Sequence, residues 1–278
     1  MTKPILVLGG TGKTGRRVVE RLTARGLPTR VGSRSGEPAF DWEDRATWAP
    51  ALEGVDKAYI SYYPDLAMPG AVERVGAFAE LAVKRGTRRL VLLAGRGEPE
   101  AEEAEEAARA AGGDLTIVRA TWFAQNFSED YMRDHVISGV VALPAGDTPE
   151  PFVDADDIAD VAVAALTDDR HIGELYELTG PRALSFADAV AEISKATGRD
   201  VTYLPITVSE HAAAAAEHGV PQEIIDLLTY LFSEVLDGRN TPVVDGVRRA
   251  LGREPRDFAE FARDAAASGA WSPSAMAV

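Results

Sequence analysis

The chain has 278 residues, enough for one large or two small domains with a sizeable core. It contains no cysteine, which excludes disulfide bonds, thiolate metal sites and a cysteine nucleophile. Its formal net charge of −15 would repel a phosphate backbone, so we expect no nucleic-acid partner.

Strand-like and helix-like patterns alternate through the first half of the chain. Short apolar runs that end at turn or polar residues predict strands, and longer periodic stretches predict helices between them. We expect strands at 4–8, 28–33, 57–61, 89–94 and 114–118, and helices at 13–25, 45–53, 70–85 and 99–111. This alternation is typical of an α/β fold with a Rossmann-like, doubly wound parallel sheet. Helices cover both faces of such a sheet, and ligands bind beyond the carboxyl ends of its strands.

The second half is predicted to form a smaller, mostly helical lobe. We expect helices at 154–167, 185–197, 211–218 and 222–236, and strands at 174–178 and 201–205. Some of these late elements are expected to return to the main sheet, and the segment after Trp271 is expected to be disordered. We therefore divide the chain into two domains, residues 1–150 and residues 151–278.

A glycine motif stands between the first expected strand and the first expected helix. Gly9, Gly12 and Gly15 form the pattern G-x-x-G-x-x-G. Residues without Cβ let the backbone turn sharply and let a pyrophosphate approach main-chain N–H groups, and the helix directs its unpaired N–H groups at the phosphates. A P-loop would need a glycine where this chain has Val7. A plain glycine-rich turn is the remaining alternative.

The end of the second expected strand carries Arg34. Sites that prefer NAD place an acidic residue here to bind the ribose 2′-hydroxyl, whereas an arginine suits the 2′-phosphate of NADP. No acidic residue follows until Glu37. The two stretches together predict that residues 1–150 bind NADP(H), and an ordinary solvated arginine is the alternative for Arg34.

Other features of the sequence favour a cytoplasmic protein. The first residues enter a strand without a signal-peptide pattern, and no apolar run approaches membrane-spanning length, so we expect no membrane contact. The four histidines show no metal-ligand spacing, so we expect no metal. Acidic side chains gather at 98–106 and 154–160, where we expect solvated helix faces. A monomer and a homodimer are both open.

Two further motifs carry a family resemblance. Residues 116–127 read TIVRATWFAQNF, and residues 151–159 read PFVDADDIA. With the glycine motif, they make the chain resemble the NmrA-like family of atypical short-chain dehydrogenases and reductases over most of its length. The aromatic residues around Trp42 and Trp122 are most similar to the subfamily of festuclavine and agroclavine dehydrogenases. Members of that subfamily are NADPH-linked reductases of iminium-type intermediates, so the resemblance implies a reductase.

The resemblance also implies roles for individual residues. Cofactor contacts are implied for Gly9, Thr11, Gly12, Lys13, Thr14 and Gly15 at the pyrophosphate, Arg34 at the 2′-phosphate, Ser61 and Tyr62 beside the adenine and ribose, and Ala94 and Gly95 near the nicotinamide ribose. The candidates for walls of a substrate pocket are Tyr63, Trp122, Phe123, Asn126, Phe127 and Phe152. Such flat side chains suit an aromatic or polycyclic substrate, and core packing is the alternative for each aromatic residue.

The usual catalytic residues of short-chain dehydrogenases are missing. Ordinary members carry a serine after one strand and a Tyr-x-x-x-Lys pattern on the next helix, whose tyrosine passes a proton to or from the substrate. Here the serine position corresponds to Gly95, and the helix expected at 99–111 contains neither tyrosine nor lysine. Tyr63, Tyr131 and His135 are our candidates for a proton donor. Glu105 with a raised pKa is a further option, although we expect a solvated side chain there.

Several functions are compatible with this pattern. The first is an NADP(H)-dependent reductase that transfers hydride to an electrophilic C=N, activated C=C or quinone group of a small aromatic or secondary-metabolite substrate. Such substrates need little acid assistance, so the protein mainly positions them. The second is a non-catalytic NADP(H) sensor that binds a partner protein, which the missing tyrosine and lysine favour. An isomerase or dehydratase with a tightly held cofactor is the third.

Overall fold

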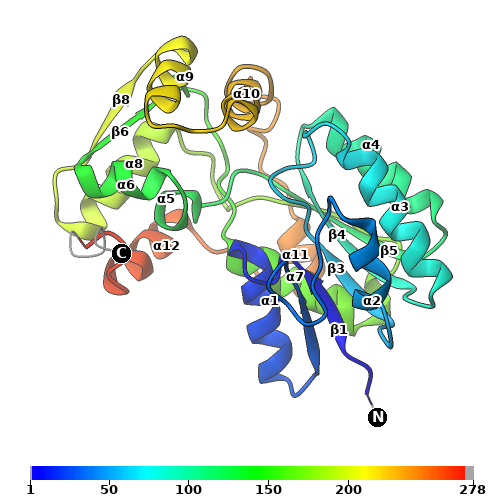
Figure 1. Cartoon of the computed structure of the whole chain (residues 1–278). Coiled ribbons are helices and arrows are strands. Elements are labelled where there is room, and N and C mark those ends of the chain that lie inside the picture. The colour runs from blue at the N-terminus through cyan, green and yellow to red at the C-terminus, as the bar shows by residue number, and fades with distance from the viewer. Residues whose placement is uncertain (1, 273–278) are drawn as a thin grey trace. The chain divides into compact units, whose positions relative to one another are not determined.

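The computed structural model describes residues 2–272, and the expected disorder after Trp271 lies, apart from Ser272, outside the described residues. The chain folds into two compact units (Figure 1). Unit 1 comprises the residues up to Ala120, Ala155–Leu178 and Asp245–Arg253. Unit 2 comprises Thr121–Asp154, Thr179–Val244 and the residues from Glu254 onward.

The centre of unit 1 is a six-stranded parallel sheet in the order β2-β1-β3-β4-β5-β7. Its strands are β1 (Ile5–Leu8), β2 (Thr29–Gly32), β3 (Lys57–Ile60), β4 (Arg89–Gly95), β5 (Asp114–Ala120) and β7 (Leu175–Leu178). The apolar runs form strands because a parallel sheet buries both faces. The prediction of a Rossmann-like α/β fold is confirmed.

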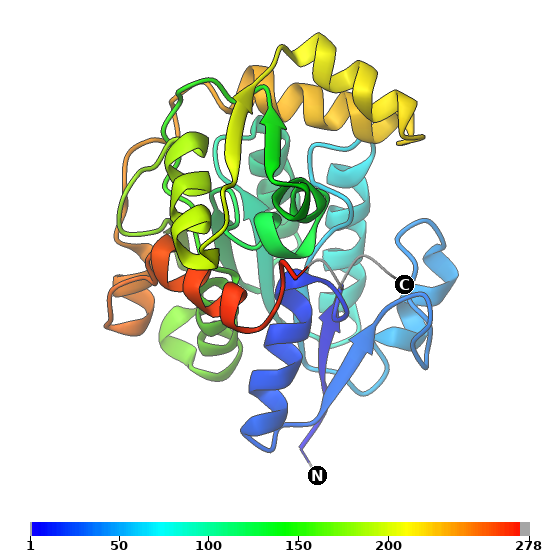
Figure 2. The same ribbon diagram turned by 90° about the vertical axis from the view of Figure 1, so that its left-hand side faces the viewer.

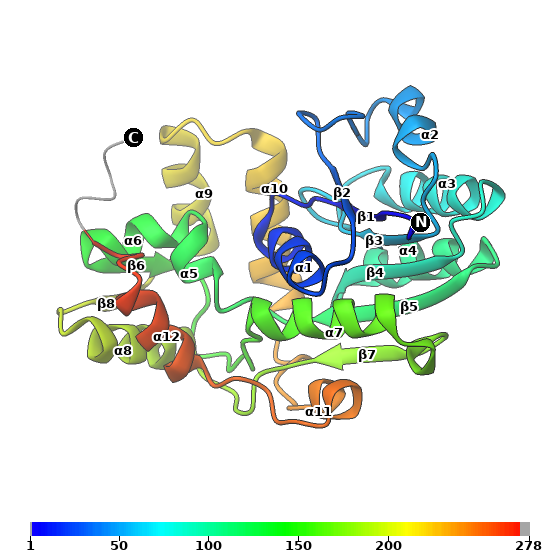
Figure 3. The same ribbon diagram turned by 90° about the horizontal axis from the view of Figure 1, so that it is seen from below.

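Helices cover both faces of this sheet. On one face, alternate strand residues such as Leu6 and Leu8 share a core with α2, α3 and α4. On the other, α7 contacts β3, β4 and β5, and α1 lies beside α7 (Figure 3). The bounds in unit 1 are α1 (Lys13–Ala24), α2 (Trp48–Ala51) after a 3₁₀ turn (Arg45–Thr47), α3 (Ala71–Lys84), α4 (Pro99–Ala110), α7 (Ala155–Thr167), a 3₁₀ turn (Asp169–His171) and α11 (Gly246–Leu251).

Acidic residues of α7 hold this helix against its neighbours. Arg21 on α1 forms ion pairs with Asp156 and Asp160, and Arg253 lies 2.7 Å from Asp157, whose side chain is fully buried. The expectation of a solvated acidic face at 154–160 is therefore wrong. Arginine side chains from elsewhere in unit 1 supply the countercharge that burial of these carboxylates requires.

Unit 2 is built around a two-stranded parallel pair. β6 (Val140–Leu143) pairs with β8 (Thr202–Pro205), and Figure 2 shows the two strands side by side, in green and yellow, with α8 alongside. The helices of unit 2 are α5 (Asn126–Glu129), α6 (Met132–Ser138), α8 (Phe186–Thr197), α9 (Val208–Glu217), α10 (Gln222–Tyr230), which continues into a π-helical turn (Leu231–Val235), and α12 (Phe258–Ala267). Phenylalanine side chains from five segments form much of its core.

The two units differ from the expected division at residue 150. Residues 121–150 belong to unit 2 because β6 pairs with β8, which follows it by some sixty positions in the chain. Residues 155–178 belong to unit 1 because α7 packs on the main sheet and β7 pairs with β5. Among the described residues, no helix is both long and apolar enough to cross a bilayer.

Candidate functional site

The glycine loop between β1 and α1 is closed by its own backbone. Gly9 has a φ of +65°, and its carbonyl accepts a hydrogen bond from the Gly12 N–H at 2.8 Å. A Cβ placed on Gly15 would lie 2.6 Å from the Gly9 carbonyl carbon and 2.8 Å from the Gly10 Cα. Only glycine therefore lets α1 approach the loop this closely.

The N-terminus of α1 faces this loop without a side-chain cap. Gly12 is the N-cap residue, in an extended conformation, and offers no side chain to the helix. The first intrahelical bond runs from the Arg16 N–H to the Gly12 carbonyl at 3.1 Å. The N–H groups that precede it have no intrahelical acceptor and lie at the positive end of the helix dipole. The loop and helix end thus fit the pyrophosphate of a dinucleotide.

The two threonines of the loop differ in their surroundings. Thr14 is buried, and its hydroxyl accepts a hydrogen bond from the buried Tyr59 hydroxyl on β3 at 2.9 Å. Burial raises the pKa of the Tyr59 phenol, which keeps this donor protonated. Thr11 is exposed. Thr14 therefore anchors the start of α1 on the sheet, and Thr11 presents the hydroxyl that solvent or a ligand can reach.

Arg34 lies in a compact turn after β2. The Ser33 carbonyl accepts hydrogen bonds from the Gly36 N–H at 3.0 Å and the Phe40 N–H at 2.9 Å, which hold the turn in place. The Arg34 side chain is exposed and, within residues 2–272, makes no hydrogen bond or ion pair. A guanidinium without a protein partner at this position is available to an anionic ligand.

The residues after β3 separate into a buried and an exposed tyrosine. Ser61 borders the glycine loop, since its Cβ lies 3.4 Å from a Cβ built on Gly9. Tyr62 is buried against the Trp42 ring, and its hydroxyl accepts a hydrogen bond from Arg74 at 3.2 Å. Tyr63 is 75% exposed, so its ring is free to meet a ligand.

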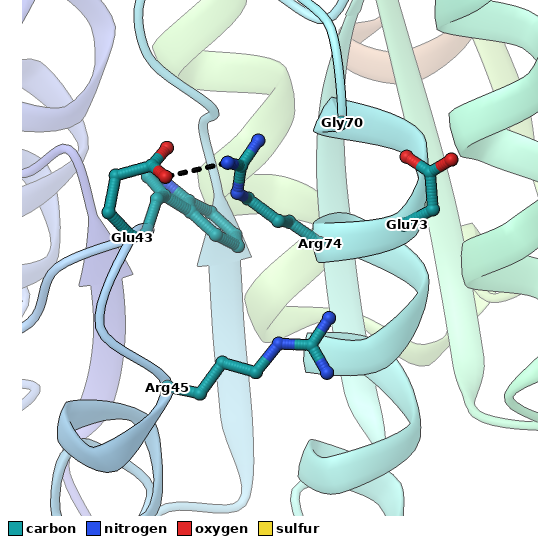
Figure 4. A pocket seen from close by; sticks show the side chains of 6 residues that line it. Glu43, Arg45, Gly70, Glu73 and Arg74 are labelled. Atoms are coloured by element: carbon teal, nitrogen blue, oxygen red, sulfur yellow. Dashed lines mark hydrogen bonds and ion pairs between the residues drawn. The ribbon is translucent and has the colours of Figure 1, made fainter.

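A hollow in unit 1 lies beside the α3 N-terminus and is lined by Trp42, Glu43, Arg45, Gly70, Glu73 and Arg74 (Figure 4). Its charges are balanced within the protein. Arg74 pairs with Glu43 at 2.6 Å, and the Arg45 guanidinium lies over the Trp48 ring at 5.4 Å. Because these cations already have partners, the hollow is a poorer anion site than the turn at Arg34.

Glu98, which follows the end of β4, carries a carboxyl group that none of the sequence motifs indicated. Gly95, the position of the usual serine, has no side chain, and a Cβ built there would overlap the Glu98 carboxyl group. Glu98 is 7% exposed, and its Oε2 is buried without a hydrogen-bond donor among the described residues. Burial, then the neighbouring Asp65, raises the pKa of Glu98 well above its usual range. In the sequence, the only indication of this buried carboxyl group is that Glu98 follows shortly after Gly95, just before the expected start of a helix.

Glu105 on α4 is held in an ion pair. Its two carboxylate oxygens accept hydrogen bonds from the Arg119 guanidinium at 2.6 and 2.7 Å, and the side chain is buried. The expectation of a solvated Glu105 is therefore wrong, because α4 packs this position against β5. Both carboxylate oxygens of Glu105 are therefore committed to the Arg119 guanidinium.

The two sequence motifs that carry the family resemblance meet in unit 2. Val153 exchanges main-chain hydrogen bonds with the strand end, donating to the Trp122 carbonyl and accepting from the Ala124 N–H, each at 2.9 Å. The Gln125 amide donates to the buried Asp154 carboxylate at 2.9 Å. Motifs separated by about thirty residues therefore form one packed structural element.

The aromatic residues expected to line a pocket fall into two groups. Phe127 and Phe152 are buried in the core of unit 2, with ring centroids 5.7 Å apart, so core packing describes their surroundings. Trp122, Phe123 and Asn126 are half-buried. The Trp122 ring also contacts Phe232, at a centroid distance of 5.0 Å. The half-buried residues remain candidates for contact with a substrate.

Tyr131 and His135 lie near each other in unit 2. Their ring centroids are 6.3 Å apart, and the His211 ring lies 6.4 Å from that of Tyr131. The Tyr131 hydroxyl is buried without a hydrogen-bond partner among residues 2–272, and burial raises its pKa. Burial lowers the pKa of both His135 and His211, so both imidazoles are neutral near pH 7.

Comparison with known proteins decides the family. The family model described as the NmrA-like family matches residues 101–262. The chain belongs to the NmrA-like family. The NAD(P)H azoreductase of Xenophilus azovorans is 32% identical over 285 residues, which cover 95% of this chain and 98% of that protein. Agroclavine dehydrogenase of Claviceps fusiformis is 31% identical, over 94% of this chain and 96% of that one.

These relatives agree with the resemblance inferred from the motifs. The match to agroclavine dehydrogenase is consistent with the ergot-alkaloid type of NmrA-like protein, and the predicted family is confirmed. Among solved structures, the NADPH-dependent quinone oxidoreductase of Escherichia coli superposes with a TM-score of 0.78 at 22% identity, covering 94% of this chain and 99% of that one. At this identity the similarity establishes the fold of this NmrA-like protein.

Proposed function

We propose that this NmrA-like protein is an NADP(H)-dependent reductase. The observation that carries the proposal is that unit 1 contains both an α1 N-terminus without a side-chain cap, behind a glycine loop, and an Arg34 guanidinium that has no partner among residues 2–272. The first suits a pyrophosphate and the second a 2′-phosphate. Two relatives that are more than 30% identical carry the names of an NAD(P)H azoreductase and a dehydrogenase, which supports hydride chemistry.

The residues of unit 1 fit the proposed cofactor. The pyrophosphate would contact the backbone from Gly9 to Gly15, including Lys13 and the Thr11 hydroxyl, while Thr14 would support the loop from beneath. Ser61 and Tyr62 would border the adenine and its ribose, and Ala94 and Gly95 the nicotinamide ribose. Bound NADPH supplies the hydride, and the protein orients it and excludes water.

The substrate would be an electrophilic, flat molecule. The helix α4 carries neither tyrosine nor lysine, and its buried Glu105 is committed to Arg119. Interconversion of alcohols and ketones by the usual tyrosine and lysine is therefore disfavoured. A C=N, activated C=C or quinone group of an aromatic compound suits the site better. Trp122, Phe123 and Asn126 are the half-buried side chains of unit 2 that we assign to its contacts.

The deciding experiment is NADPH oxidation by the purified chain against a panel of quinones, activated alkenes and cyclic imines. Turnover with any of them, lost on omission of the protein, supports the reductase. NADPH binding without turnover, together with a co-purifying protein partner, would overturn it in favour of the NADP(H) sensor. An NADH series run in parallel tests the preference for NADPH.

A further inference from the structure

Two carboxyl groups meet at the carboxyl end of the central strand of unit 1. Glu98 follows β4 and immediately precedes α4, and its carboxyl group fills the space beside Gly95 that a side chain there would occupy. Asp65 comes from the loop after β3, where its carboxylate accepts a hydrogen bond from the Ala67 N–H at 2.9 Å. The Glu98 and Asp65 carboxyl groups are neighbours, and each influences the pKa of the other.

Two neighbouring carboxyl groups repel each other when both are ionised, so one of them keeps its proton. Glu98 is more suited than Asp65 to keep this proton. It is 7% exposed, its Oε2 has no hydrogen-bond donor within the described residues, and it lacks the main-chain hydrogen bond that stabilises charge on Asp65. Burial, Asp65 and Glu100 all raise the pKa of Glu98, whereas main-chain hydrogen bonds oppose the rise at Asp65.

The position of this proton matters for the proposed reaction. Ordinary short-chain dehydrogenases place a serine hydroxyl at the strand end where this chain has Gly95, and here the Glu98 carboxyl group occupies that space. We propose that Glu98, beside Asp65, is the proton donor to the reduced substrate. This inference rests on the proposed reductase function and adds the acid that the missing Tyr-x-x-x-Lys pattern leaves unassigned.

The step balances without a further reagent. The hydride would come from bound NADPH, whose C–H bond breaks as it is oxidised to NADP+. When this hydride adds to one end of an activated C=C or a quinone, a bond to hydrogen forms there and the π electrons move to the far carbon or oxygen. The O–H bond of Glu98 breaks, and its proton joins that atom. The resulting carboxylate recovers a proton from water. An iminium carbon instead becomes a neutral amine on hydride addition, so it needs no proton from Glu98.

Two of the other candidate donors, Tyr131 and His135, are poorly suited to release a proton near pH 7. Burial raises the pKa of the Tyr131 phenol, which disfavours loss of its proton. Burial lowers the pKa of His135, so its imidazole carries no spare proton at neutral pH. Glu98 differs from both because it is an acidic group whose protonated form is favoured by burial.

The variant Glu98→Gln tests the proposal, because glutamine keeps the size and one hydrogen bond but cannot release a proton. Its control is Glu103→Gln, which changes an exposed residue on α4. We expect Glu98→Gln to reduce quinones and activated alkenes about 100-fold more slowly, the scale of general acid catalysis. Reduction of cyclic iminium ions and NADPH affinity should stay at the wild-type level. Equal quinone rates in Glu98→Gln and wild type would overturn the inference and leave the reductase function standing.

A second measurement needs neither cofactor nor turnover. The infrared difference spectrum between wild type and Glu98→Gln at pH 7 should contain the C=O band of a protonated carboxyl group. Its absence would overturn the proposal even if rates change. In Asp65→Asn, the amide would donate to Glu98 and stabilise its ionised form, so quinone reduction should decline at lower pH than in wild type. If the wild type binds NADPH and reduces nothing, the function and this role of Glu98 fail together.

Discussion

Gly15 is the position at which one methyl group tests the proposed cofactor loop most directly. In Gly15→Ala, the new Cβ would approach three backbone atoms of Gly9 and Gly10 within 2.8 Å, and no side-chain rotation can relieve contacts with backbone. Overpacking of this kind costs about 1–3 kcal/mol. Because the contacts are with backbone atoms, we expect the free energy of unfolding to fall by about 2 kcal/mol. Because the loop must move, NADPH affinity should fall at least about tenfold, the equivalent of roughly 1.4 kcal/mol.

The matched variant is Gly12→Ala. Its Cβ would meet only the Gly9 carbonyl oxygen, at 3.2 Å, and would otherwise point toward solvent. We expect it to weaken NADPH binding while leaving stability almost unchanged. Urea unfolding followed by circular dichroism measures the stability, and NADPH fluorescence titration measures the binding. A Gly15→Ala protein with wild-type stability would refute the packing argument, and wild-type NADPH affinity would refute the role of the loop.

Three other outcomes follow from the contacts described above. Arg34→Ala should weaken NADP binding about 10–100-fold and leave NAD binding unchanged, since it removes a charge-assisted contact to the 2′-phosphate; equal effects on both dinucleotides would show that the assignment is wrong. Arg119→Leu leaves the buried Glu105 carboxylate without a cation and should cost about 3–5 kcal/mol in urea unfolding. A cost below about 1 kcal/mol would contradict the assigned ion pair, and a Glu105→Gln change in the same chain should restore part of the loss. The pKa of Glu98 is higher in the folded state than in the unfolded state, so the folded chain binds this proton more tightly. Stability should therefore fall as pH rises from the ordinary glutamate pKa toward the raised one, and Glu98→Gln should lack this decline; parallel pH curves of unfolding free energy would contradict it.

The main sheet could be predicted because its signals are local. The strand expected at 89–94 is β4, and the helix expected at 13–25 is α1, with differences of one residue at their ends. A short apolar run and the periodic pattern of a helix can each be recognised from residues that are close together in the chain. The helix expected from 211 begins at Val208 instead, because Thr207 and Glu210 form a capping box that the prediction overlooked.

The candidate site was less predictable from the sequence. Phe127 and Phe152 look like pocket walls in the motifs, yet both lie in the core of unit 2, since aromatic residues serve packing and binding equally well. The acidic stretch at 98–106 looks uniformly solvated, yet Glu98 and Glu105 are buried and have different partners. The spacing of residues along a helix indicates which side chains lie on the same face of that helix. The segment that packs against this face is distant in the sequence, so the spacing cannot show which side chains become buried.

The sequence by itself determined the parallel sheet, the glycine loop and the placement of Arg34 after β2, because each depends on residues within a few positions of one another. Only the tertiary structure decided that residues 155–178 join the first unit, that Thr14 is held by Tyr59, and that Glu98 is buried beside Asp65. These depend on burial and on contacts between segments far apart in the chain. The desolvation that retains a proton on a carboxyl group exists only after such segments pack together.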